Sequence, residues 1–253
     1  MTAADSSRID VLRPEWSVPS CVRATFSLRA GGVSAAPFDS LNISARVGDL
    51  PFAVTENRRR LSHSLSLPTE PLWLEQVHGT AVLEVGAADP PVSGRTADAV
   101  ITRLPGRVCV IQVADCLPVL LAASDGSVVA AAHAGWRGLA AGVLEATVNR
   151  MGLDPSRLVA WLGPAIGIGH FEVGDEVRSA FLAREATADF AFVVNARGRW
   201  QCDLVGLARR RLGALGVGSV FGGAWCTYAD PVRFFSFRRD ARCGRMAALI
   251  WLG

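Results

Sequence analysis

The sequence predicts one α+β domain over residues 1–253, in which a mixed or antiparallel β-sheet is flanked by helices. Strand-like runs follow one another in hairpin-like succession between residues 72 and 133, so the regular alternation of a parallel α/β fold fails. Gly and Pro punctuate the chain evenly, and no linker or repeat divides it. Half of the residues are hydrophobic and 19% are charged, which excludes a disordered chain. Only residues 1–15 are expected to form a flexible N-terminus.

Strands are predicted where short apolar runs are bounded by turn-forming residues. The longest apolar tract, residues 108–123, is interrupted by Gln112, Asp115 and Pro118, which predicts two buried strands around a polar bend. The predicted strands are residues 21–28, 72–74, 80–85, 98–102, 108–113, 119–122, 128–132, 158–162, 190–194, 217–221 and 246–252.

Helices are predicted where apolar residues recur with helical spacing between suitable ends. Residues 51–65 follow Asp49 as N-cap, with Pro in the first turn. Residues 139–151 carry an apolar stripe that ends at Gly152. Asp203 is the predicted N-cap of a helix over 204–215, and a shorter helix is predicted over 175–184.

Composition excludes several classes of function. All 26 basic residues are arginine, which excludes lysine chemistry, and a net charge of +3 is too small to indicate nucleic-acid binding. No uninterrupted apolar run is long enough for a membrane span, and the first ten residues resemble no secretory signal, so we expect a cytoplasmic protein. The six cysteines lack a C-x-x-C spacing, which favours free thiols over disulfides. The oligomeric state stays open between a monomer and a small homo-oligomer.

Three polar side chains stand in apolar surroundings at the ends of predicted strands. His78 lies in QVHG, Cys116 in ADCLP and His133 in AHAGWRG. One thiolate and two imidazoles with an open fourth position describe a catalytic zinc site better than a structural one.

Taken singly, these residues also suit ordinary structural roles. A buried Cys is usually a small hydrophobic residue, a His before Gly often occupies a turn, and a His at a strand end often bonds a carbonyl. The three residues are too far apart in sequence to match a local zinc motif. The combination still favours a site, because two of only four histidines fall in such contexts.

Longer motifs in the same regions resemble a known family. The segments QVHG, ADCLPVLL, AAHAGWRG, LGPAIG followed by HFEVG, CTY, FFSFRRD, GR and ALIWL resemble the YfiH-like family. Its members are also called laccase-domain or polyphenol oxidase proteins and peptidoglycan editing factors. The resemblance extends from Val47 to the C-terminus. Two departures are visible, Ile168-Gly169 in place of the usual Pro-Cys and Phe237 in place of a frequent Tyr, and they bear on substrate preference.

The resemblance implies a zinc ion held by His78, Cys116 and His133. It also implies purine nucleoside chemistry: phosphorolysis of adenosine, inosine, guanosine or methylthioadenosine with phosphate, and deamination of adenosine. Zinc with one thiolate and two neutral imidazoles would lower the pKa of bound water toward about 7, which suits attack on C6 of adenine.

Further residues are candidates for supporting roles. Arg137 follows His133 at a predicted helix entrance and is suited to bind phosphate or the purine, and a surface ion pair is the alternative. Asp115 is expected to orient a ligating imidazole or to handle a proton. Arg58, Trp136 and His170 are candidates for substrate binding, although Trp136 equally suits a core position.

Other functions remain as alternatives. A His₂Cys set also suits copper and polyphenol oxidation, but a multicopper site needs more than four histidines. A metal-free hydrolase would use Cys116 as nucleophile and His133 as base, and a peptidoglycan precursor is one substrate for such an enzyme. A partner-binding protein with structural zinc would need a fourth ligand, and no motif supplies one.

Overall fold

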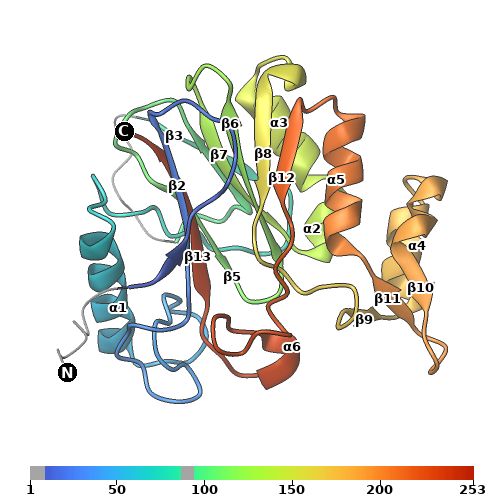
Figure 1. Ribbon diagram of the computed structural model, residues 1–253, viewed down its shortest axis with the longest axis horizontal. Coiled ribbons are helices and arrows are strands. Elements are labelled where there is room, and N and C mark those ends of the chain that lie inside the picture. The colour runs from blue at the N-terminus through green and yellow to red at the C-terminus, as the bar shows by residue number, and fades with distance from the viewer. Residues whose placement is uncertain (1–8, 87–93) are drawn as a thin grey trace.

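Two β-sheets lie face to face, and helices cover their outer faces (Figure 1). The computed structural model describes residues 9–86 and 94–253. The strands are β1 (Val11–Leu12), β2 (Val22–Ser27), β3 (Val82–Val85), β4 (Ala99–Thr102), β5 (Cys109–Val113), β6 (Leu117–Ala123), β7 (Val129–Ala134), β8 (Leu158–Leu162), β9 (Glu172–Val173), β10 (Phe192–Val194), β11 (Trp200–Cys202), β12 (Ser219–Gly222) and β13 (Met246–Leu252). The helices are α1 (Pro51–Ser64), α2 (Trp136–Ala141), α3 (Val143–Met151), α4 (Asp175–Leu182), α5 (Leu204–Ala214) and α6 (Phe237–Asp240), with short 3-10 turns at Pro155–Arg157 and Ala186–Ala191.

The strand order confirms the predicted mixed sheet and α+β class. The larger sheet has the order β12-β8-β6-β7-β4-β3, and the smaller one β1-β2-β13-β5. Strands β3 and β4 are parallel, as are β8 and β12, whereas the pairs between β4, β7, β6 and β8 are antiparallel. A third sheet, β10-β11-β9, lies beside α4.

Apolar side chains fill three layers. Phe26, Ile111 and Leu120 pack between the two large sheets, and Leu144 of α3 packs with residues of the larger sheet on its other face. Leu61 of α1 packs with residues of the smaller sheet. Because β6 is covered on both faces, its sequence is continuously apolar and does not alternate.

The chain passes from one sheet to the other between β5 and β6. The predicted polar bend is confirmed here, with Asp115 at a φ of +86°, a conformation that residues other than Gly rarely adopt. Because β5 belongs to the smaller sheet and β6 to the larger, the bend brings Cys116 to one end of the β-sandwich.

Several predicted elements need correction. Residues 72–74 form only a bridge between Leu72 and Cys109, and β9 and β11 were not predicted. The predicted helix over 139–151 is broken into α2 and α3 at Gly142, whose φ of +105° ends the first helix. Within the expected flexible N-terminus, residues 1–8 lie outside the described residues, whereas Ile9 is buried and β1 pairs with β2.

One predicted helix cap is confirmed and one is wrong. The Asp203 carboxylate accepts a hydrogen bond from the Gly206 N–H at the start of α5. Asp49 does not cap α1, because its carboxylate accepts hydrogen bonds from the side chains of Ser34 and Asn42. Among the described residues, no helix combines the length and apolarity that crossing a membrane requires.

Candidate metal centre and cavity

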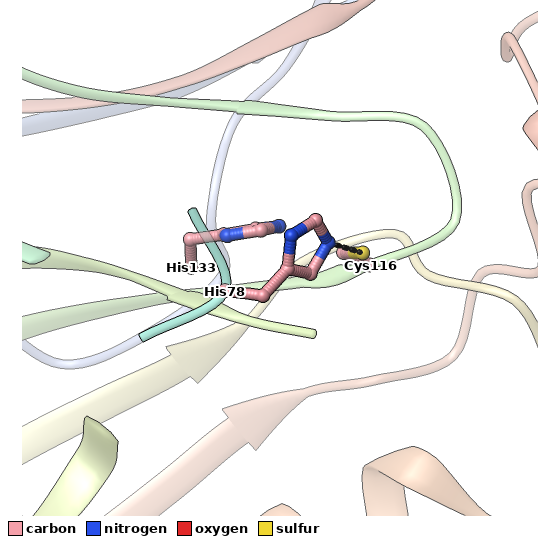
Figure 2. A group of neighbouring side chains, drawn as sticks. All are labelled: His78, Cys116 and His133. Atoms are coloured by element: carbon pink, nitrogen blue, oxygen red, sulfur yellow. Dashed lines mark hydrogen bonds between the residues drawn. The ribbon is translucent and has the colours of Figure 1, made fainter. Parts of the chain in front are cut away.

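Three segments distant in sequence bring His78, Cys116 and His133 together (Figure 2). Antiparallel pairing of β6 and β7 places Pro118 opposite His133, so Cys116 lies beside the end of β7. His78 precedes β3 in a loop where its φ is +61°. One ligand atom from each residue lies within 4.8 Å of the others, and Cys116 Sγ is 3.7 Å from His78 Nε2.

Asp98, a residue that no motif indicated, contacts the imidazole of His133 and the backbone of His78. Its buried carboxylate is 2.9 Å from His133 Nδ1 and accepts the backbone N–H groups of His78 at 2.8 Å and Gly79 at 2.6 Å. The contact at Nδ1 leaves Nε2 of His133 free to act as a ligand. The only signal in the sequence was an acidic residue beginning an apolar strand.

Asp98, His133 and Cys116 shift one another's pKa values toward the charged forms. Burial would raise the pKa of Asp98, but the hydrogen bonds from His133 and from backbone N–H groups hold it below its usual value. Burial would likewise raise the pKa of Cys116, yet the neighbouring imidazoles lower it to about 6. Burial alone would lower the pKa of His133, but the Cys116 thiolate and Asp98 raise it to about 9. Without a metal, the group therefore holds a thiolate at neutral pH.

Small residues let the ligands approach. A Cβ atom on Gly135 would lie 2.8 Å from His78 Cδ2 and 3.0 Å from Cys116 Sγ. A Cβ atom on Gly138 would lie 2.9 Å from the Gly79 carbonyl oxygen. The two glycines of the AGWRG segment are therefore required by the close packing of α2 against the loop that carries His78.

The three residues lie in the wall of a cavity of about 490 Å³. Some of its other walls come from residues near the three in sequence and some from distant segments, including Gln76, Gln112, Trp136, Arg137, Ile166, Phe171, Phe237, Arg238 and Arg245. Such a volume is in the range of small-molecule sites.

Three arginines of the cavity wall each lie over an aromatic ring. The guanidinium of Arg137 is 4.4 Å from the ring centroid of Trp136. Arg238 is 5.3 Å from Phe171, and Arg245 is 5.7 Å from Phe237. A guanidinium that lies over an aromatic ring is attracted by the ring face, and its N–H groups can still bind an anion. The cavity is therefore suited to a negatively charged ligand.

The arginines are anchored to different extents. Nη1 of Arg238 donates a hydrogen bond to the carbonyl oxygen of Glu172, and Nη1 of Arg245 donates to those of Cys243 and Gly244. Among the residues that the structure describes, no carboxylate forms an ion pair with these two side chains or with Arg137. Arg238 and Arg245 were not predicted, because only the fold brings them to the cavity.

The predicted supporting residues fall into two groups. Arg137 and Trp136 line the cavity, as does Asp115, which contacts neither imidazole and instead accepts hydrogen bonds from Thr227 and the Arg238 backbone. Arg58 and His170 do not line it.

The two remaining side chains have partners elsewhere. Arg58 stacks on Trp73 at 4.1 Å and donates a hydrogen bond to the Ile43 carbonyl oxygen. His170 is exposed and stacks on Tyr228, with ring centroids 4.4 Å apart. The expectation that Asp115 orients an imidazole is wrong, because its carboxylate contacts Thr227 and Arg238 while Asp98 contacts His133 Nδ1.

The donor set fits zinc. Zn–S and Zn–N bonds of about 2.3 and 2.1 Å in a tetrahedron place a thiolate sulfur and an imidazole nitrogen roughly 3.6 Å apart. The distance of 3.7 Å from Cys116 Sγ to His78 Nε2 agrees with this geometry. In the part of the chain that the structure describes, no fourth His, Cys, Asp or Glu belongs to the group.

Comparisons with known proteins connect this site to a family. The model of a family described as multi-copper polyphenol oxidoreductase laccase matches residues 23–253. The chain is 55% identical to a protein named purine nucleoside phosphorylase PA4543 from Pseudomonas aeruginosa, over 95% of this chain and 98% of that protein. It is 51% identical to purine nucleoside phosphorylase YfiH from Escherichia coli, over 94% of this chain and 97% of that protein.

Solved structures share the fold. The Neisseria meningitidis protein NMB0706 superposes with a TM-score of 0.91 at 42% identity and covers 96% of this chain and 98% of its own. A Bacillus licheniformis hypothetical protein YfiH superposes with a TM-score of 0.87 at 30% identity, covering 92% of this chain and 93% of its own. The likeness therefore extends over the whole sandwich.

Proposed function

The chain belongs to the family of multi-copper polyphenol oxidoreductase laccases, also known as YfiH-like proteins, and we propose that it is a zinc-dependent purine nucleoside phosphorylase. The observation that carries the proposal is the pairing of a His₂Cys group with stacked arginines in one cavity. Phosphorolysis needs a place for inorganic phosphate beside the reacting sugar, and these arginines provide it. The relatives named purine nucleoside phosphorylase support the same substrate class.

The roles of the residues follow from the reaction. A phosphate oxygen bonds to C1′ of the nucleoside, the C1′–N9 bond breaks, and the purine leaves with the bonding electron pair and takes up a proton. Arg137, Arg238 and Arg245 hold the phosphate, and Trp136 and Phe237 supply apolar surface for the base. His78, Cys116 and His133 would hold the zinc ion, which would supply Lewis acidity in the cavity wall.

Deamination of adenosine uses the same centre and is the second reaction that we propose. The open fourth position of the ligand group favours it. Known zinc deaminases also use a free carboxylate as general acid and base. Asp115 is the one carboxylate among the described residues that line the cavity, and two donors already occupy it. Phosphorolysis is therefore the principal reaction of this proposal.

Copper oxidase chemistry fits the site less well. All four histidines lie in the described part of the chain, and only two of them belong to the ligand group. A multicopper oxidase needs a trinuclear cluster besides its blue-copper site. Met151 and Met246 are buried and do not line the cavity, so neither is placed as an axial ligand.

Metal analysis and a nucleoside panel test the proposal together. The purified protein is expected to contain about one zinc ion per chain and to release free base from adenosine, inosine, guanosine or methylthioadenosine only when phosphate is added. Cys116→Ala is expected to lose bound zinc and phosphorolysis together. Phosphate-independent inosine formation alone would favour deamination. Full turnover by Cys116→Ala would refute the centre, as would phenol oxidation that depends on bound copper.

A metal-free Cys/His hydrolase is the remaining alternative, because Cys116 and His133 also suit a nucleophile and its base. It predicts an activity that alkylation abolishes and that chelators leave unchanged. A peptidoglycan precursor in the same panel extends the test to amide hydrolysis. Loss of nucleoside turnover on chelation, with recovery on adding zinc, is the result that we expect.

A further inference from the structure

We propose that Asp115 is a positioning residue that fixes the anion-binding Arg238 relative to the metal centre. The inference rests on the proposed phosphorylase function, because it assigns Arg238 to phosphate. It begins from the unusual place of Asp115, a buried carboxylate with a positive φ, directly before the ligand Cys116. Such a conformation in a residue other than Gly is maintained by its surroundings.

The two oxygens of Asp115 bind two segments near the C-terminus. Oδ1 accepts the hydroxyl of Thr227 at 2.6 Å, and Oδ2 accepts the backbone N–H of Arg238 at 2.7 Å. Thr227 follows β12, and Arg238 lies in α6. One carboxylate therefore connects the bend between the two large sheets with the loop that carries Thr227 and with α6, which lines the cavity.

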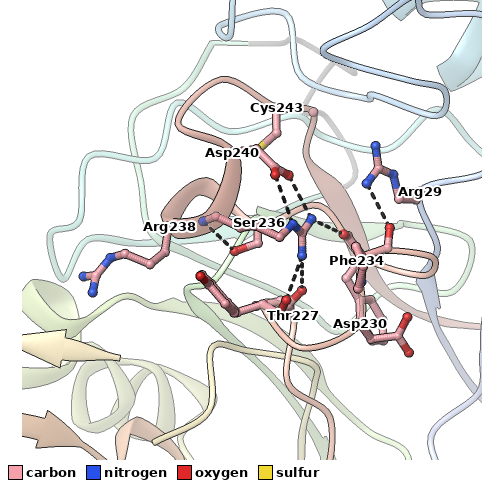
Figure 3. A network of polar contacts seen from close by, with 12 residues as sticks. Arg29, Thr227, Asp230, Phe234, Ser236, Arg238, Asp240 and Cys243 are labelled. Carbon is pink, nitrogen blue, oxygen red and sulfur yellow. Dashed lines mark hydrogen bonds and ion pairs between the residues drawn. The ribbon is translucent and has the colours of Figure 1, made fainter. Parts of the chain in front are cut away.

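Arg239 closes this connection into a ring of hydrogen bonds, and Figure 3 shows those that reach Thr227, Phe234 and Asp240. Its Nη1 donates to the carbonyl oxygens of Thr227 and Tyr228, and its Nη2 donates to that of Phe234. Asp240 accepts from Nε and Nη2 of the same guanidinium. Thr227 is thus held twice, by Asp115 through its hydroxyl and by Arg239 through its carbonyl oxygen.

The side chain of Arg238 points away from this network (Figure 3). It is held by its contact with the Phe171 ring and by the hydrogen bond from Nη1 to Glu172 O. Its Nε and Nη2 have no partner among the residues that the structure describes and are available for a ligand. Asp115 fixes the backbone from which the side chain starts. Because α6 is a single short turn, removing this contact frees the position of Arg238 more than that of Arg137 or Arg245.

The test uses the zinc-loaded protein and inorganic phosphate. Phosphate affinity is measured by titration calorimetry, and KM and kcat are measured separately for phosphate and nucleoside. Asp115→Ala removes both hydrogen bonds, and Thr227→Val removes one of them while it keeps the side-chain shape. We expect the Kd and KM for phosphate to rise about tenfold or more in Asp115→Ala and less in Thr227→Val. Zinc content, nucleoside KM and kcat at saturating phosphate should stay within about twofold of the wild type.

Asp230→Ala is the matched control. Asp230 lies in the same C-terminal region, where its carboxylate accepts hydrogen bonds from the backbone and side chain of Arg233, and it does not line the cavity. It is expected to lower the melting temperature without changing the phosphate Kd. If Asp115→Ala fails to fold, the phosphate Kd and the kinetic constants are measured on Asp115→Asn and Thr227→Val instead. Each of these variants keeps part of the contact among Asp115, Thr227 and Arg238.

A double-mutant cycle identifies the residue through which Asp115 acts. If Asp115 acts through Arg238, adding Asp115→Ala to Arg238→Ala changes phosphate affinity by less than twofold. Additive effects would overturn the proposal, and so would loss of zinc from Asp115→Ala, which would assign its role to Cys116. An equal change in all kinetic constants and in the Asp230→Ala control would indicate a structural role only. A wild-type protein that binds no phosphate would overturn the proposed function itself.

Discussion

Replacing Asp98 by Asn tests whether one carboxylate orients the metal ligands. Asp98 accepts hydrogen bonds from the backbone N–H groups of residues 77–79 and contacts His133 Nδ1. An amide keeps the shape of the side chain but replaces one accepting oxygen by an NH₂ group. That group then faces a donor, and the negative charge beside the imidazole is lost.

The size of the effect follows from these contacts. Oδ1 serves His133 and His78, and Oδ2 serves Val77 and Gly79, so either orientation of the amide breaks two contacts. Hydrogen bonds to a charged group contribute about 1.5–3 kcal/mol each to stability. Breaking two of them lowers the free energy of unfolding by at most about 3–6 kcal/mol. Loss of a carboxylate that orients a metal-binding histidine lowers metal affinity about 10- to 100-fold.

Chelator competition measures this loss directly. Wild-type protein and Asp98→Asn are titrated with zinc in the presence of a chelator of known affinity, and both are melted with and without zinc. We expect weaker zinc binding and a smaller zinc-induced rise in melting temperature for the variant. Asp154→Asn, at an exposed turn far along the chain, is the control. Unchanged zinc affinity in Asp98→Asn, whatever happens to its stability, would refute the reasoning.

Three further predictions concern the packing and titration of the site. Gly135→Ala places a Cβ atom 2.8 Å from His78 Cδ2 and 3.0 Å from Cys116 Sγ, so zinc affinity in the chelator assay should fall about tenfold or more. The control is Gly213→Ala in α5, where the added Cβ atom meets open space and should raise the melting temperature slightly. Arg58→Ala should lower the free energy of unfolding in urea by about 1–2 kcal/mol, because its contact with Trp73 and its hydrogen bond to Ile43 are lost. The KM for phosphate should stay unchanged, and a large rise in that KM would show that Arg58 contributes to phosphate binding. In zinc-free protein the pKa of Cys116 is lowered to about 6, so this thiolate should react with iodoacetamide at pH 7. The alkylation rate should fall as the pH drops below 6. A rate profile with its inflection near the pKa of an ordinary thiol would contradict this prediction.

The sequence predicted what depends on local pattern. Strand β8 and strand β13 were placed with correct bounds, because short apolar runs between turn residues are typical of buried strands. The helix over 139–151 was predicted without its break, because the apolar spacing continues across Gly142 and only the positive φ of that glycine reveals two helices. His78, Cys116 and His133 were indicated by their places at the ends of apolar runs and by the motifs of the resemblance, and the fold brings the three side chains together.

What the sequence did not reveal depends on contacts across the fold. Arg238 and Arg245 resemble any other arginine in a chain that has 26 basic residues, all of them arginine, until β13 and α6 bring them to the cavity. Arg58 was chosen from a run of arginines, and its stacking on Trp73 depends on a contact that no local spacing indicates. Local motifs therefore indicated the candidate metal ligands better than the arginines of the cavity wall.

The two buried aspartates show why a position beside a ligand was a poor guide to its role. Asp115 adjoins Cys116 in sequence, yet its side chain turns toward Thr227 and Arg238, because the chain changes sheets at this residue. Asp98 is distant from every ligand in sequence, but the pairing of Ala99 with Ala132 places it beside His133. The antiparallel register of β4 and β7 thus determines which carboxylate reaches the imidazole. A substitution that shifts this register is expected to weaken metal binding before it disturbs Arg238 and Arg245, which lie outside β4 and β7.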